Sequence, residues 1–196
     1  MSELAADAVQ PIVLKEWAVA IRALLEGKQM MLLRKGGIRE ETRHFQLVSP
    51  SFYFMPTYEH QKKELVKPSF QPWVEETMSE FNAADPNVKI AAYGEVTEDI
   101  ELYDQDSLDR LRDFHIWTDS FAEERLRWKK KQPLHLLLVR VFKLEEPTEI
   151  KLREAYIGCK SWVRLEDEIA NARMSPVIEQ HEYDDAVQKI TKLLRN

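Results

Sequence analysis

The sequence predicts an α+β protein in which helices pack on a mixed, mostly antiparallel sheet. Segments with helical periodicity and short apolar segments follow one another without a regular βαβ order. The strand expected over residues 134–144 contains a Leu-Leu-Leu-Val run, which is typical of a central strand covered on both faces. Apolar residues recur at helical spacing over residues 183–194 and predict a C-terminal amphipathic helix.

Composition restricts the class of protein. The chain has 196 residues, of which 44% are hydrophobic and 32% charged, and its formal net charge is −6, a profile typical of a globular protein. No apolar run reaches the about 18 residues that a bilayer span needs. The N-terminus is acidic where a signal peptide would be basic, so we expect a cytoplasmic protein without a membrane partner. A single cysteine, Cys159, excludes an internal disulfide and a zinc site built on several thiolates.

The first half of the chain contains both predicted helices and predicted strands. Apolar residues at helical spacing predict a helix over residues 12–26, and Gly27 is placed to end it in a left-handed cap. A short apolar run predicts a strand over residues 30–33. Pro72 suits a first helical turn and opens a helix that ends near residue 81. The further expectations are strands over residues 45–48 and 52–55 and a short helix over 57–65 capped by Thr57.

The second half is richer in predicted strands. Residues 89–93 and 95–103 predict two strands split by Gly94, and the spacing from Ser120 to Glu123 matches a capping box that opens a helix to about residue 129. We expect one α+β domain over residues 12–169, followed over 170–196 by an exposed connection and the C-terminal helix packed on that domain. The shorter expected elements are a helix over residues 107–114 and strands over 150–152 and 161–165.

A basic loop after the second predicted element is the first candidate binding site. Arg34, Lys35 and Arg39 flank Gly36 and Gly37, which would let the backbone approach a ligand closely. Guanidinium groups and free backbone N–H groups suit a phosphate or a carboxylate. The alternative is a solvated hairpin loop in which the glycines only make the turn.

Two polar segments next to aromatic residues are candidates for contacting a planar base. Tyr58, His60 and Gln61 follow an aromatic strand, and glutamine is a good bidentate reader of an amide-like edge. His115 and Trp117 form the second pair, and a histidine within reach of Asp119 or Glu59 would be a plausible general base. The alternatives are an exposed helical turn for the first segment and an interior histidine with a core tryptophan for the second.

Three further features are ambiguous. The basic segment 125–131 surrounds Trp128 and could bind a nucleic-acid backbone or be a solvated helix end. Lys160 and Trp162 follow a glycine turn and are candidate ligand contacts, whereas the lone Cys159 is expected to be a small hydrophobic residue. Arg140 shares a strand face with apolar residues, so we expect it to pair with an acid or to line a pocket.

Several of these stretches together resemble an uncharacterised bacterial family, domain-of-unknown-function family 1802. That family has no established activity, and the association of some members with restriction endonuclease domains implies a role near DNA restriction. In the family a second histidine often stands where this chain has Phe114, which argues against a mechanism that needs a histidine pair. The stretches that carry the resemblance are residues 14–40, 52–61, 115–118, 137–144 and 156–165.

A fainter similarity is to PUA-like barrels of the ASCH type. These domains also begin with a helix, a Gly-Lys turn and a strand that ends in arginine, as at Gly27, Lys28 and Arg34. The similarity implies a PUA-like barrel as the alternative form of the sheet. It also implies a cleft beside the first helix that binds RNA or modified bases.

The leading hypothesis is a non-catalytic domain that recognises DNA, RNA or a nucleotide and needs no cofactor or metal. One alternative is a hydrolase or nuclease that depends on a metal or on His60 and His115. The other is an interaction subunit that docks on a neighbouring enzyme through Tyr183, Val187, Ile190 and Leu194. The predicted ligand-binding residues are Arg34, Lys35, Gly36, Gly37, Arg39, Tyr58, His60, Gln61, His115, Trp117, Arg140, Lys160 and Trp162.

Overall fold

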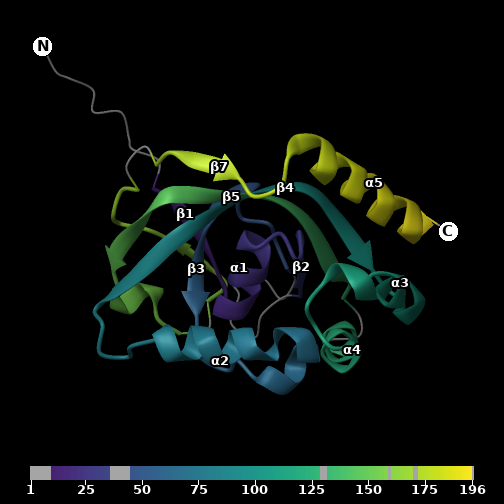
Figure 1. Cartoon of the computed structure of the whole chain (residues 1–196), viewed down its shortest axis with the longest axis horizontal. Coiled ribbons are helices and arrows are strands. Elements are labelled where there is room, and N and C mark those ends of the chain that lie inside the picture. The colour runs from purple at the N-terminus through teal and green to yellow at the C-terminus, as the bar shows by residue number, and fades with distance from the viewer. Residues whose placement is uncertain (1–9, 36–44, 129–131, 159, 170–171, 196) are drawn as a thin grey trace, which may run out of the picture.

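The computed structural model describes residues 10–35, 45–128, 132–158, 160–169 and 172–195. It confirms the predicted α+β class with a mostly antiparallel sheet (Figure 1). Six strands form the order β2-β5-β4-β3-β1-β6, and β7 pairs with β5. The strands are β1 (Ile12–Trp17), β2 (Met31–Arg34), β3 (Ser51–Thr57), β4 (Asn87–Leu102), β5 (Leu134–Lys151), β6 (Trp162–Arg164) and β7 (Met174–Pro176).

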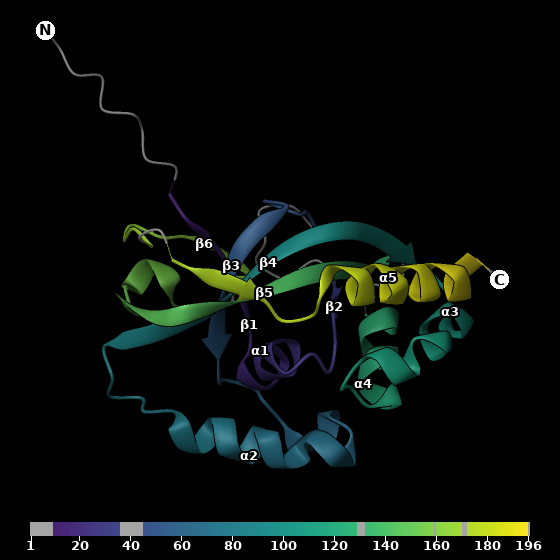
Figure 2. The ribbon, with the colours of Figure 1, turned by 45° about the horizontal axis from the view of Figure 1, so that its top comes forward.

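Helices pack on the inner side of this curved sheet (Figures 1 and 2). The helix α1 lies within its curve, beneath β4 and β5, and α2 packs on the outer side of α1 (Figures 1 and 2). Pairing is antiparallel throughout the described strands except between β1 and β3, which run parallel. The helices are α1 (Ala18–Leu25), α2 (Gln71–Glu80), α3 (Gln105–Arg110), α4 (Asp119–Arg127) and α5 (Gln180–Arg195), with short 3₁₀ helices at Lys63–Leu65, Pro68–Phe70, Arg112–Phe114 and Glu154–Tyr156.

The two long strands β4 and β5 correct the prediction that Gly94 separates two strands. Gly94 lies inside the continuous strand β4, opposite Val141 of β5 and Phe52 of β3. A Cβ at this position would stand 2.8 Å from atoms of both Phe54 and Val139. The glycine therefore permits close packing against the core instead of ending a strand. The strand predicted over residues 150–152 is likewise the end of β5.

The first predicted helix is also corrected. Residues 12–17 form β1, and α1 begins only at Ala18. β1 pairs with β3 on one side and with β6 on the other, and Val13 and Leu14 are fully buried between them. The interstrand hydrogen bonds thus override a helical spacing of apolar residues. The predicted left-handed cap is confirmed, because Gly27 has φ of 63°.

Other local predictions near β3 and α4 are wrong. Thr57 ends β3 instead of capping a helix, and its hydroxyl donates to the carbonyl oxygen of Glu16 at 3.1 Å. Residues 45–48 form no strand. The cap of α4 is Thr118, whose hydroxyl oxygen accepts from the N–H of Phe121 at 3.3 Å, and not Ser120.

The C-terminal segment is part of the fold. β7 extends the edge of β5, and α5 packs on the core through Tyr183 and Ile190, which are 3% and 0% exposed. The Tyr183 hydroxyl lies 2.7 Å from the hydroxyl of Thr97 on β4. Because the same chain covers this apolar stripe, the alternative of a free docking helix loses its basis.

Candidate functional site

A group of charged side chains lies where β1 ends. The Glu16 carboxylate of β1 accepts a hydrogen bond from the Arg34 guanidinium of β2 at 3.1 Å, and both side chains are only 10% exposed. The other carboxylate oxygen accepts from the backbone N–H of Trp17 at 2.8 Å. Arg125 of α4 lies close enough for Arg34 and Glu16 to shift its pKa. We call Glu16, Arg34 and Arg125 the charged cluster.

The curvature of the sheet brings this cluster together. β1 and β2 are not neighbours, because β3, β4 and β5 lie between them in the strand order. The sheet curls around α1, so the end of β2 returns to the end of β1 (Figures 1 and 2). The ion pair between Glu16 and Arg34 therefore spans the open side of the curve.

Three aromatic rings pack beside the charged cluster. Trp17 meets Trp117 edge-on with 5.4 Å between ring centroids, and Phe121 lies 5.8 Å from Trp17 and 4.4 Å from Trp117. Trp117 and Phe121 are buried, whereas Trp17 is half-buried. The Arg125 guanidinium stands 5.0 Å above the Phe121 ring. We call Trp17, Trp117 and Phe121 the aromatic triad.

Positive charge predominates in this region. Burial lowers the pKa of Arg125, the charge of Arg34 lowers it further, and Glu16 opposes the shift. Lys35 is buried, and its ammonium donates to the carbonyl oxygen of Leu126 near the end of α4. Burial lowers the pKa of Lys35. The arrangement can hold an anion next to a surface on which a planar ring can stack.

The structure brings four of the predicted binding residues to this region. Arg34 belongs to the charged cluster, Trp117 belongs to the aromatic triad, and Lys35 contacts α4. Gln61 reaches the first turn of α1, where its side-chain oxygen accepts from the N–H of Val19 at 2.9 Å.

Sequence reasoning missed Glu16, Trp17 and Phe121 as site residues, and it placed Arg125 only in a basic segment. Glu16 and Trp17 fell inside the predicted helix over residues 12–26. The prediction therefore did not place them at the end of a strand, where they meet side chains from β2 and α4. The charged residue next to a tryptophan at the end of an apolar run is the signal that could have identified them.

Tyr58 and the two histidines have different surroundings. Tyr58 stacks on Phe81 after α2, with 4.4 Å between the ring centroids. His60 is exposed on a turn and has φ of 66°, whereas His115 is 3% exposed. No hydrogen bond joins the two histidines within the described ranges.

The remaining predicted residues lie elsewhere. Lys160 is exposed and donates to the carbonyl oxygen of Ala155 at 3.3 Å. Trp162 packs edge-on against Phe52 with 5.0 Å between ring centroids. Arg140 lines a cavity of about 10 Å³ under α5, which is room for about one water molecule. The predictions for Gly36, Gly37, Arg39, Cys159 and residues 129–131 fall outside the described residues.

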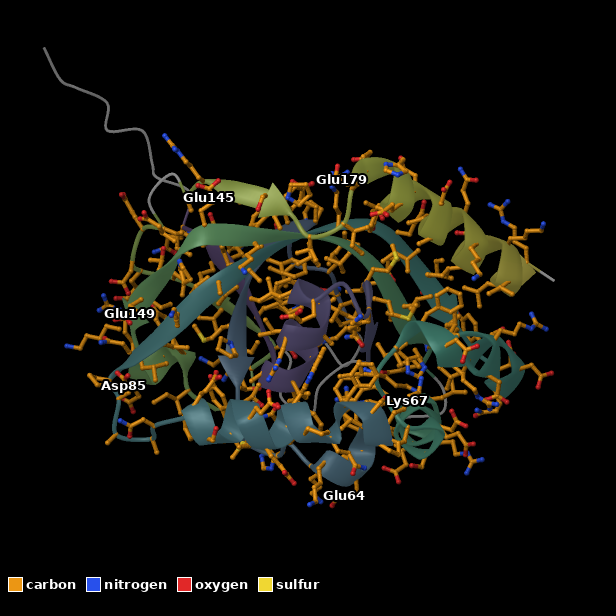
Figure 3. All side chains as sticks on the ribbon, viewed as in Figure 1. Glu64, Lys67, Asp85, Glu145, Glu149 and Glu179 are labelled. Carbon is orange, nitrogen blue, oxygen red and sulfur yellow. The ribbon has the colours of Figure 1, made fainter. Side chains whose placement is uncertain are left out.

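His115 gives the site region a predicted pH response. Burial, aided by the positive charge of Lys67 (Figure 3), lowers the pKa of His115 to about 4, and Asp119 opposes the shift. The unfolded chain binds the proton more readily, so stability is complete above about pH 6.5 and falls as the pH drops toward 4. From pH 7.5 to pH 5 we expect His115 to lower the free energy of unfolding by about 2 kcal/mol.

Urea unfolding at several pH values checks this expectation. The variant His115→Phe should lose most of the slope, while the exposed His181→Gln should keep it. Equal slopes in the wild type and His115→Phe would contradict the assignment.

Neither a metal-binding cluster nor a membrane-spanning helix is found among the described residues. Within the described ranges no three side chains of His, Cys, Asp or Glu are grouped so that they could hold a metal ion. No helix in the described part of the chain has both the length and the apolar character needed to cross a bilayer.

The comparisons with known proteins address the family. The chain is similar to the solved structure of ASCH from Zymomonas mobilis, with 12% identity, a TM-score of 0.46 and coverage of 92% of this chain and 96% of that chain. A mutant of that protein gives 11% identity and the same TM-score and coverage. No curated protein matches the chain. The family model described as "Domain of unknown function (DUF1802)" matches residues 13–189, which confirms the family resemblance of the sequence. The chain belongs to the DUF1802 family.

Proposed function

We propose that this protein recognises a nucleic acid or nucleotide-like ligand at the charged cluster and the aromatic triad. The observation that carries the proposal is the contact between the two groups: the Arg125 guanidinium lies on the ring of Phe121, and Phe121 contacts both tryptophans. Cations attract phosphate oxygens, and aromatic rings stack on bases of any sequence.

The chain has a net charge of −6, and several of its acidic residues lie toward one end of β5. Arg34 lies opposite His135, near the beginning of β5. Glu149 lies near the other end of the same strand, where Asp85 and Glu145 are also found (Figure 3). These three acidic side chains lie away from the charged cluster, whereas Asp99 pairs with His135 opposite Arg34 and keeps some negative charge near it.

Binding of labelled single-stranded RNA and DNA and of duplexes, measured by fluorescence anisotropy over a range of salt concentrations, tests the proposal. We expect single strands to bind with an affinity that falls as salt rises. The variant Trp17→Leu should weaken binding about tenfold or more because a stacking surface is lost. The matched variant Trp73→Leu, on α2 and outside the triad, should bind as the wild type does.

Absence of binding to every oligonucleotide at low salt would overturn the proposal. The DNA measurements bear on the association with restriction that the family resemblance implies. Such a role predicts binding to DNA, whereas binding to RNA alone would argue against it.

A further inference from the structure

We propose that the charged cluster binds one phosphodiester group within a nucleic-acid chain, in preference to the terminal phosphate of a mononucleotide. This inference rests on the proposed function and adds the chemical class of the group that occupies the site. It makes the ligand an oligonucleotide strand whose neighbouring base stacks on Trp17.

The charged cluster has more positive than negative charge, which favours the binding of an anion. Two guanidinium groups, Arg34 and Arg125, share the single carboxylate of Glu16, which leaves one positive charge without a counterion among the described residues. The Arg34 side chain is about nine-tenths buried. The Arg125 side chain is partly exposed, yet burial already disfavours its charged form, so a bound anion beside the two guanidinium groups would stabilise the site.

The hydrogen-bond balance points the same way. Both oxygens of Glu16 already accept, one from Arg34 and one from the backbone of Trp17. The Nε–H of Arg34 is buried and has no acceptor among the described residues. A guanidinium offers five N–H donors in a fixed fork, which matches two oxygens of a phosphate.

Charge magnitude distinguishes the two kinds of phosphate. A phosphodiester has a charge of −1, whereas a terminal phosphate has about −1.5 to −2 at neutral pH. Within the three groups of the charged cluster, the diester neutralises the one excess positive charge, while the additional charge of a monoester would face the Glu16 carboxylate. The half-buried Trp17 is next to Glu16 in the chain, so a base joined to the same phosphate can reach its ring.

Competition against a labelled single strand tests the inference. The competitors are a dinucleoside phosphate, its uncharged methylphosphonate analogue and a nucleoside 5′-monophosphate. We expect the dinucleoside phosphate to compete at least about tenfold better than either of the others. Equal competition by the monophosphate or by the uncharged analogue would overturn the inference and leave the proposed function standing. Absence of strand binding by the wild type would instead remove the proposed function.

Variants of two arginines on one helix provide a second measurement. Arg125→Gln should weaken strand binding about tenfold to a hundredfold and reduce the slope of log affinity against log salt by about 0.7. Arg127→Gln, an exposed residue of the same helix that pairs with Glu123, should change neither value. An unchanged slope in a folded Arg125→Gln variant would contradict the assignment. If the Arg125→Gln variant does not fold, the competition measurements with the wild-type protein test the inference instead.

Discussion

Glu16→Ala is expected to lower the free energy of unfolding by about 3–5 kcal/mol, because it leaves a buried guanidinium without its partner. The Glu16 and Arg34 side chains are each 10% exposed, so water compensates little for the lost carboxylate. The backbone N–H of Trp17 loses its acceptor as well. Urea unfolding at neutral pH measures the change.

A matched acidic residue provides the control for this prediction. Glu149 lies on β5, is exposed and forms no ion pair among the described residues. Glu149→Ala should shift stability by no more than about 0.5 kcal/mol. A loss in Glu16→Ala as small as this would show that Glu16 does not compensate the buried cations. A folded Glu16→Ala protein should also gain more stability from a single-stranded oligonucleotide than the wild type does, because the site then has a greater excess of positive charge.

Trp117→Ala is expected to cost about 3–5 kcal/mol through the lost packing of a large buried ring. Trp117 is 5% exposed and contacts the two other rings of the aromatic triad. Its backbone also forms a bridge with Val66, which joins the segment before α4 to the segment before α2. The cavity left by alanine would therefore lie where several segments meet.

Denaturant unfolding measures this loss, and binding of single strands measures its consequence for the site. Trp117→Phe should recover part of the stability, since an aromatic ring is kept. Tyr103→Ala is the control, because Tyr103 is 69% exposed, and it should change stability by no more than about 0.5 kcal/mol. A Trp117→Ala protein as stable as this control would contradict the packing assigned to the triad.

Local patterns predicted several elements well. The helix expected from Pro72 is α2, the apolar run at residues 30–33 falls largely in β2, and the periodic stretch near the C-terminus lies in α5. In each case a repeat of a few residues matches the period of the element. Such a repeat depends on neighbours along the chain, which the sequence displays directly.

Other predictions failed where distant pairing decided the outcome. Residues 12–17 have a spacing compatible with a helix, yet they form β1 because β3 and β6 provide hydrogen-bond partners on both sides. Gly94 resembles a strand end in the sequence, yet it lies in β4 because Phe54 and Val139 leave no room for a side chain. These partners are far away in the chain, and their positions depend on the finished sheet.

The sequence by itself determined the α+β class and the family resemblance, and it singled out four residues that the structure places in this region, Arg34, Lys35, Gln61 and Trp117. Only the tertiary structure decided that Arg34 pairs with Glu16, 18 positions away in the chain, and that Arg125 joins them from α4. The same curvature left Tyr58, Arg140, Lys160 and Trp162 in other parts of the molecule. The physical reason is that residue type and local spacing fix short-range hydrogen bonding, whereas the meeting of charges from β1, β2 and α4 depends on how the whole sheet curls around α1.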